Sequence, residues 1–217
     1  GTGAEVSMTA VLTGPVKKLG LKCDWTVFDQ IVLDPDLIAT VPNDQWFYTG
    51  MDTYIHSVEA ITGTKKNTFA EAYSEKSLEL CREVYLKRER SDPKSDELLM
   101  VASYMGGLSL TYSEVGVCHA LSYGLGKVLE MHHCSANCVA FNQLEDVYGE
   151  YVHEFKHMVK ERGIHIPANL AKDWDEATLD AMAEVAYNLP HMWDHAFGPD
   201  WQKVLDRERI KGWYRRM

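Results

Sequence analysis

The sequence predicts a mainly α-helical fold, a helical bundle preceded by a short N-terminal β element. From residue 43 onward, apolar residues recur at helical spacing in one segment after another, with Gly, Pro and charged turns between them. Before Pro42 the apolar runs are short, β-branched and bounded by Gly, Pro and Asp, which is typical of strands. The 217 residues, 46% of them hydrophobic, suffice for the core of one domain, or of one domain plus part of another.

The expected elements follow in chain order. Residues 9–14 and 26–34 are the expected strands. Asn43 and Asp44 can cap a first helix that runs up to Gly63, and a second amphipathic helix is expected over residues 67–87. After the charged turn RERSDPKSDE, Ser95 or Asp96 is expected to cap a third helix. Further helices are expected over 116–130, 134–147, 149–162, 176–188 and 199–210, whereas HMWDH at 191–195 is expected in a turn region.

The composition narrows the classes of partner that the protein could bind and the setting in which it works. With 22 basic and 32 acidic residues the net charge is −10, which disfavours nucleic acid and anionic membrane surfaces. No apolar run approaches the length of a membrane span, and no signal-peptide pattern opens the chain. The five scattered cysteines do not form a disulfide framework, and Cys134 and Cys138 are expected to be buried thiols. These features predict a reducing, cytoplasmic setting.

The segment YVHEFKHMV contains H-E-x-x-H, the signature of zinc proteases. On a helix, His153 and His157 share one face and could bind zinc, with Glu154 as general base. The apolar stripe of this helix lies on the opposite face, however, and Lys156 inside the motif would work against a cation. We expect a solvated helix face here, and a zinc hydrolase stays as an alternative.

A second pair of candidate ligands lies in TGMDTYIHSVEA. Asp52 and His56 are four residues apart, so on a helix both side chains leave the same face. Their neighbours are apolar, so the carboxylate and the imidazole would be partly desolvated and would need a partner. Two interpretations stay open from these residues alone: a satisfied Asp–His pair in the core, or half of a metal site.

His119 and His133 supply the other half. Fourteen residues would separate them by about 21 Å on one continuous helix, too far to share a metal. Gly124 and Gly126 weaken such a helix, and a break near 130–132 would let the chain fold back. Together with Asp52 and His56 they would form a shell of three imidazoles and one carboxylate, which suits Fe²⁺ or Zn²⁺ with one open position.

Three blocks carry a resemblance to a known family: GTGAEV at 1–6, GMDTYIH at 50–56 and GVCHALSYGLGKVLEMHHCSAN at 116–137. At these residues the chain resembles the metal-dependent alcohol dehydrogenases usually called iron-containing, relatives of dehydroquinate synthase and glycerol dehydrogenase. In that family the metal is held by an Asp, a His four residues later, and two further His 14 apart. The resemblance thus implies Asp52, His56, His119 and His133 as ligands, on a dehydroquinate synthase-like C-terminal helical domain.

The resemblance also implies a domain organisation. Residues 1–42 would be the remnant of an α/β nucleotide-binding domain, the rest of which is expected upstream of Gly1. Residues 43–217 would be the all-helical, metal-binding catalytic domain.

Roles for five further residues come from the same family. The GTG loop of Gly1, Thr2 and Gly3 matches a loop that contacts the nicotinamide cofactor, and Lys18 would lie near the cofactor ribose. Tyr123 occupies a position where several members have a His in the proton path; with a pKa near 10, a tyrosine is a poor general base there.

The implied activity is oxidation of a primary hydroxyl to an aldehyde, with NAD or NADP and a divalent metal, Fe²⁺ or Zn²⁺. Within the family, the amino-acid sequence is most similar to that of members that oxidise a sugar acid, 3-deoxy-D-manno-octulosonate, at C8. Their product is converted to an 8-amino sugar of lipopolysaccharide. That implies a functional link to a PLP aminotransferase, and family members often form homodimers. Besides the zinc hydrolase, a non-catalytic helical metal-binding module stays open.

Overall fold

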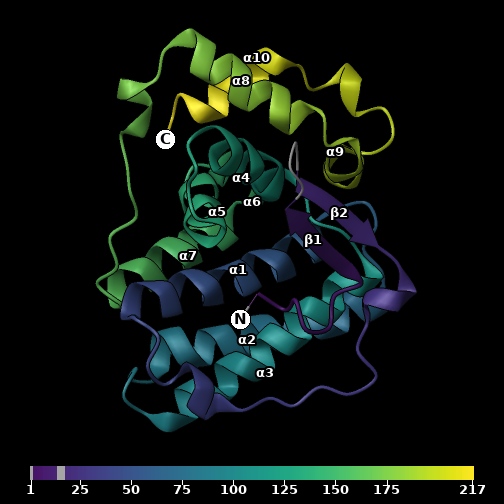
Figure 1. The fold of residues 1–217 in the computed structure, drawn as a ribbon. Coiled ribbons are helices and arrows are strands. Elements are labelled where there is room, and N and C mark those ends of the chain that lie inside the picture. The colour runs from purple at the N-terminus through teal and green to yellow at the C-terminus, as the bar shows by residue number, and fades with distance from the viewer. Residues whose placement is uncertain (1, 14–17) are drawn as a thin grey trace.

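The structure, a computed structural model, describes residues 2–13 and 18–217 and is mainly helical, as predicted (Figure 1). Strands β1 (Thr9–Thr13) and β2 (Lys18–Lys22) form an antiparallel hairpin with Thr9 opposite Lys22. Figure 1 shows this hairpin at one side of the helices, near the ends of α4 and α9. The short β element and the helical bundle therefore agree with the expected fold class.

Helix α1 (Asn43–Thr62) runs through the middle of the molecule, with α2 (Thr68–Lys87) and α3 (Pro93–Tyr112) packed on one side (Figure 1). Most of its residues from Trp46 to Ala60 are buried, because other helices cover it on both sides. Such all-round burial is expected of a central helix. The Asn67 side chain caps α2 by accepting from the backbone N–H groups of Phe69 and Ala70.

Four helices lie on the other side of α1: α4 (Val117–Val128), α5 (His133–Phe141), α6 (Glu145–Tyr148) and α7 (Glu150–Glu161) (Figure 1). Helix α4 ends at Val128, and the chain then reverses through Leu129 and Glu130, the latter with a φ of +54°. Helix α5 then packs against α4. The break predicted near 130–132 is confirmed, and it places His119 and His133 on different helices.

A C-terminal layer covers α4. It consists of α8 (Glu176–Tyr187), α9 (Pro190–Phe197) and α10 (Arg207–Tyr214), with α8 packed on both α4 and α10. The Met217 carbonyl, after α10, accepts a hydrogen bond of 2.7 Å from the backbone N–H of Leu170, which begins a 3₁₀ turn (Leu170–Asp173) just before α8.

The predicted strand over 26–34 was wrong. Its first residue ends a 3₁₀ turn, η1 (Asp24–Thr26), and the segment then runs irregularly to η2 (Pro35–Ile38). The partner of β1 is instead Lys18–Lys22, which precedes that segment in the chain. Asp34 accepts from the Asp36 backbone N–H and so begins η2, which favours a turn over an extended strand.

Several helix boundaries also differ from the prediction. Asp92, one residue before Pro93, caps α3, since its carboxylate accepts from the Lys94 N–H. The expected helix over 134–147 is divided into α5 and α6. The expected helix over 199–210 is instead the 3₁₀ turn η4 (Trp201–Lys203) followed by α10, which Asp206 caps, and the expected turn at 191–195 is part of α9.

All five cysteines are free thiols, and Cys134 and Cys138 are buried as predicted. In the described part of the chain, none of the helices combines the length and the apolar character needed to cross a bilayer.

Candidate metal centre

Helix α1 presents Asp52 and His56 one turn apart on the same face. The Asp52 Oδ1 and His56 Nε2 atoms are 3.6 Å apart, and both residues are buried. Since α1 is covered on all sides, the two polar side chains can only face other core groups. Among the described residues, Asp52, His56 and His119 form the only cluster of three potential metal ligands whose donor atoms all lie within 4.8 Å.

Helices α4 and α5 complete the arrangement. His119 Nε2 lies 3.4 Å and His133 Nε2 lies 3.7 Å from Asp52 Oδ1. The rings of His56 and His119 are stacked with centroids 4.7 Å apart, and those of His119 and His133 are 5.5 Å apart. Four ligands placed about 2.1 Å from a tetrahedral Zn²⁺ would be about 3.4 Å from one another. The spacing around Asp52 therefore fits a shared ion.

Two buried atoms of the cluster support the same interpretation. Asp52 Oδ2 and His56 Nδ1 have no hydrogen-bond partner within the described residues. A buried carboxylate oxygen without a donor is costly, and a cation would compensate its charge. One carboxylate and three imidazoles are a donor set that suits Fe²⁺ or Zn²⁺. The residues present thus fit a divalent metal in both spacing and chemistry.

The buried members of the cluster differ in the direction in which their pKa values are shifted. Burial alone would raise the pKa of Asp52, but the neighbouring His56, His119 and His133 hold that pKa well below its usual range. Burial would lower the pKa of His119, yet the carboxylates of Glu59 and Asp52 raise it to about 10. For His56 burial prevails and lowers the pKa to about 4, so this imidazole is neutral at pH 7.

His133 is the exposed member of the cluster. Its side chain is 41% exposed, compared with 4% for His119 and none for Asp52. The ring of Tyr123, on α4, meets the His133 ring edge-on at a centroid distance of 6.2 Å. Burial raises the pKa of Tyr123, with smaller contributions from Glu114 and Asp52, so its hydroxyl stays protonated. A protonated hydroxyl at the open side of the cluster can donate a hydrogen bond but is unsuited to act as a base.

Two further residues of the cluster were not among the predicted ligands. The Glu59 carboxylate lies 2.5 Å from His119 Nδ1, and the Asn137 amide nitrogen lies 2.5 Å from Asp52 Oδ1. Helical spacing from a predicted ligand was the one sequence signal for these two residues, and by itself it did not assign them a role. Glu59 is seven residues after Asp52, and Asn137 is four residues after His133, so each lies on the same helix face as a predicted ligand.

The H-E-x-x-H residues are placed quite differently. Both oxygens of Glu154 bind the Arg82 guanidinium, at 2.6 and 3.0 Å, and one of them also accepts from the Tyr54 hydroxyl. His153 is half exposed and pairs with Glu145, while His157 is exposed and lies near Glu161. The two histidines thus each face an acid at the surface, as expected for a solvated face, and Glu154 has a structural role.

The residues expected at the cofactor are only partly described. Gly1 lies outside the described residues, and so does the side chain of Lys18, whose backbone belongs to β2. Thr2 and Gly3 form a loop on α3, where the Gly3 N–H donates to the Ser103 hydroxyl at 3.0 Å. Gly3 has a φ of +70°, and its backbone approaches that of Gly107 so closely that a Cβ atom on either residue would clash with the other, so Gly107 of α3 serves close packing. The cofactor role of these four residues stays a prediction.

A helical bundle with one carboxylate and two imidazoles buried in its core, and a third imidazole at the exposed side of the same cluster, defines a class: helical domains with a candidate metal centre. The sequence comparison identifies the family. The family model for the C-terminal domain of Fe-containing alcohol dehydrogenases matches residues 46–190, and the chain belongs to this family.

Individual relatives agree with the family. The chain is 32% identical over 146 residues to a 1-propanol dehydrogenase of Citrobacter freundii, covering 64% of this chain and 39% of that protein. It is 28% identical over 196 residues to an alcohol dehydrogenase of Thermococcus barophilus, covering 88% and 48%. The iron-containing alcohol dehydrogenase of Thermococcus thioreducens has the same fold, with a TM-score of 0.82 at 22% identity, over 99% of this chain and 61% of that one. The chain thus spans about a third to a half of the curated relatives that it matches.

Proposed function

We propose that this chain is the metal-binding helical part of an NAD(P)-dependent alcohol dehydrogenase that oxidises a primary hydroxyl to an aldehyde. Family membership supports the class of reaction. The observation that carries the proposal is the convergence of His56, His119 and His133, from three helices, within 3.4 to 3.7 Å of Asp52 Oδ1, with donor atoms of Asp52, His56 and His119 all within 4.8 Å of one another. A divalent metal bound there would supply a Lewis acid for the substrate oxygen, and the nicotinamide would accept a hydride.

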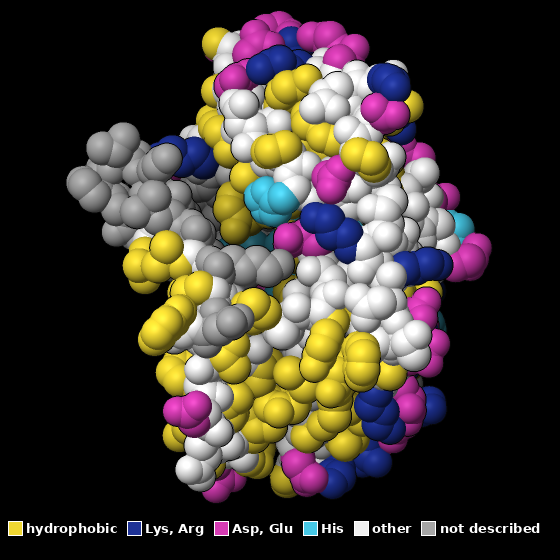
Figure 2. All heavy atoms as spheres, turned by 90° about the vertical axis from the view of Figure 1, so that its right-hand side faces the viewer, with side chains coloured by type: hydrophobic (Ala, Val, Ile, Leu, Met, Phe, Trp, Pro, Cys, Tyr) yellow, Lys and Arg dark blue, Asp and Glu magenta, His cyan; other side chains and the backbone are white. Residues whose placement is uncertain are grey.

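The chain's own residues would divide the work. Asp52 and the two buried imidazoles would fix the position of the ion, and His133 would mark the side from which a hydroxyl approaches, since it alone is substantially exposed. Tyr123, protonated beside His133, would orient that hydroxyl by donating a hydrogen bond. Figure 2 shows one face of the molecule, in which a histidine side chain borders a hollow.

We extend the proposal to residues 1–42, as the part that belongs with a nucleotide-binding domain, with Gly1, Thr2, Gly3 and Lys18 near the cofactor. Several large apolar side chains of this segment are exposed, as they would be in a segment that another domain covers: Trp25, Phe28, Val32 and Leu37. The finer substrate assignment rests on resemblance alone. The substrate would be a sugar acid, 3-deoxy-D-manno-octulosonate, oxidised at C8, and a PLP aminotransferase would act on the product. The dehydrogenase would be a cytoplasmic homodimer.

Metal content tests the site directly. Wild type, His119→Ala, His56→Ala and His153→Ala would each be loaded with Zn²⁺ or Fe²⁺, desalted, and analysed for bound metal. We expect about one ion per chain in wild type and in His153→Ala, and a loss of at least tenfold in affinity in the other two variants. Loss of metal in His153→Ala alone would favour the zinc hydrolase. Absence of metal from wild type would leave Asp52 and His56 as a core pair.

Turnover tests the activity and the substrate. The full-length protein would be assayed for NADH or NADPH formation with 3-deoxy-D-manno-octulosonate and with 1-propanol as a simple primary alcohol. We expect the sugar acid to give the higher kcat/KM. A preference for 1-propanol would overturn the sugar-acid assignment but not the class, whereas bound metal without turnover on any alcohol would favour the non-catalytic module.

A further inference from the structure

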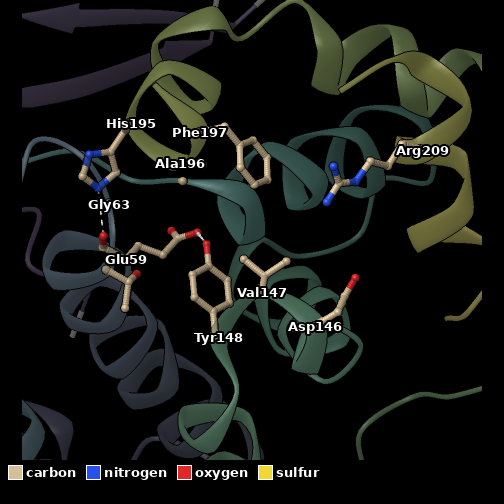
Figure 3. Close-up of a pocket in the computed structure, with 11 residues that line it drawn as sticks. Glu59, Gly63, Asp146, Val147, Tyr148, His195, Ala196, Phe197 and Arg209 are labelled. Carbon is tan, nitrogen blue, oxygen red and sulfur yellow. Dashed lines mark hydrogen bonds between the residues drawn. The ribbon is translucent and has the colours of Figure 1, made fainter. Parts of the chain in front are cut away.

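Glu59 is a fully buried carboxylate at the junction of three helices. It belongs to α1, and its two oxygens accept from the Cys118 backbone N–H at 2.7 Å, from the Tyr148 hydroxyl at 2.6 Å, and from His119 Nδ1 at 2.5 Å. Figure 3 shows Glu59 and Tyr148 pointing toward each other across the lining of a pocket between α1, α6 and α9. Three donors on one buried carboxylate satisfy its charge and leave it little freedom to move.

The two ring nitrogens of His119 have different partners. Nδ1 faces Glu59, and Nε2 faces Asp52 Oδ1 at 3.4 Å, on the side of the cluster. Because an ionised carboxylate only accepts, the proton of a neutral His119 lies on Nδ1, and the lone pair of Nε2 is directed at the cluster. His56 differs, since its Nδ1 is buried with no hydrogen-bond partner in the described part of the chain.

We propose that Glu59 is the positioning residue of the metal centre: it fixes the ring orientation and the tautomer of His119, and so sets the affinity of the cluster for a divalent ion. This inference rests on the proposed metal site. The hydrogen bond from Cys118, the residue before His119 in α4, holds the carboxylate against the first turn of that helix. Tyr148 fixes the carboxylate from α6, so the ring of His119 is aligned by three elements at once.

The substitution Glu59→Gln keeps the size of the side chain and removes one acceptor. The NH₂ group of the glutamine side chain cannot accept a hydrogen bond from His119 Nδ1. If this NH₂ group faces the ring, it donates to Nδ1, and the proton of a neutral His119 moves to Nε2, the nitrogen that should bind the ion. If it faces away, it meets the Cys118 N–H, which is also a donor. Either arrangement works against the geometry of the cluster.

Zn²⁺ affinity, measured by competition with a chromophoric chelator, tests the inference without reference to turnover. We expect Glu59→Gln to bind Zn²⁺ 10- to 100-fold more weakly than wild type, the range typical of groups that orient a ligand. Glu154→Gln is the matched control, because Glu154 also binds an α1 hydroxyl and a cation but lies away from the cluster. We expect its Zn²⁺ affinity to be unchanged.

A long-range ¹H–¹⁵N spectrum of the Zn²⁺-loaded wild type gives a readout that a merely structural role would not move. We expect a proton on Nδ1 of His119 and none on Nε2. The opposite tautomer would overturn the inference even if Glu59→Gln failed to fold, and so would wild-type affinity in a folded Glu59→Gln. A wild type that binds no Zn²⁺ would overturn the proposed metal site, and the inference with it; a variant effect confined to stability would overturn the inference alone.

Discussion

The Asn137 carboxamide lies among the candidate ligands. Its Nδ2 atom is 2.5 Å from Asp52 Oδ1, 3.2 Å from His119 Nε2 and 3.3 Å from His133 Nε2, while its Oδ1 is buried without a hydrogen-bond partner among the described residues. One amide group therefore directs the partial positive charge of its nitrogen toward three of the four candidate metal ligands. Its position on α5, one turn after His133, is what brings it there.

We expect Asn137→Ala to lower the free energy of unfolding by about 1.5–3 kcal/mol, because it removes a hydrogen bond from a fully buried carboxylate. Saturating Zn²⁺ should recover part of this loss, since the cation compensates the charge of Asp52 in place of the amide. Urea unfolding of wild type and variant, with and without Zn²⁺, measures both effects. The exposed Asn188, whose amide binds Glu184, is the control, and Asn188→Ala should stay within about 0.5 kcal/mol of wild type. An equal loss with and without Zn²⁺ would contradict the prediction.

At this scale, the sequence revealed contacts within one helix better than contacts between helices. Asp52 and His56 follow from i, i+4 spacing alone. Bringing His119 and His133 to them requires a reversal at Glu130 and the packing of α4 and α5 on α1, which spacing allows but does not specify. Glu59 could not be assigned because its partners come from α4 and α6, and a glutamate in isolation resembles a solvated one.

At the scale of single helices, the amphipathic segments were predicted well and the short ones poorly. The helices α1 and α2 have long apolar patterns with Asn at or next to their first turn, so their bounds were nearly correct. The segment 199–210 also shows apolar spacing, but Asp206 can cap a new helix by accepting from the Arg209 N–H, and the chain uses that cap. A cap within a periodic pattern can start a second helix, and the period alone does not reveal this.

Gly124 gives a prediction about the packing of α4. A Cβ atom there would lie 2.1 Å from the Tyr214 hydroxyl oxygen and 2.8 Å from the Met182 carbonyl oxygen, and that hydroxyl is held by the Leu121 carbonyl at 2.7 Å. We expect Gly124→Ala to destabilise the chain by about 1–3 kcal/mol, since α4 must move away from α8 and α10. The sequence interpretation, in which Gly124 weakens the helix, missed this role: α4 continues through it to Val128.

Gly126, two residues later in the same helix, is the matched control. A Cβ atom there would meet only the Met131 carbonyl oxygen, at 3.4 Å, an ordinary contact. Gly126→Ala should therefore be neutral, or stabilise the chain by up to about 1 kcal/mol through the helix propensity of alanine. Chemical denaturation of both variants compares the two. Equal effects at the two positions would show that helix propensity, and not the contact with Tyr214, determines how Gly124→Ala changes the free energy of unfolding.

At the scale of the whole molecule, the C-terminal layer closes on the helix that carries His119, and one lysine joins its two main helices. Lys211 of α10 places its ammonium 2.8 Å from Glu176, 2.7 Å from Asp180 and 3.0 Å from Glu208. Its side chain is only 7% exposed, whereas the three carboxylates are 64–67% exposed, so solvent screens the network in part. Without Lys211, Arg215 would still pair with Glu176 and Glu208, whereas Asp180 would lose the ion pair that it makes with Lys211.

The network makes the stability of this layer depend on pH. Hydrogen bonds from Lys211 and Arg215 lower the pKa of Glu176 below its ordinary value of 4.5, so its contribution is present above that value and is lost as pH falls through the lowered pKa. Hydrogen bonds to Asp180, Glu176 and Glu208 raise the pKa of Lys211 above 10.5, so its contribution is complete below that value and is lost only at higher pH. Between these limits both are present.

We therefore expect Lys211→Met to lower the melting temperature clearly at pH 7 and much less at pH 3, because the contribution of the Glu176 carboxylate is lost as pH falls through its lowered pKa. Thermal unfolding of wild type and variant across this range measures the difference. Lys203→Met is the control, because Lys203 pairs with Asp200 where both side chains are about three-quarters exposed, and it should change little at either pH. A loss for Lys211→Met that is the same at pH 3 and pH 7 would contradict the prediction, because it would show that the ion pairs of Lys211 do not account for its contribution to stability.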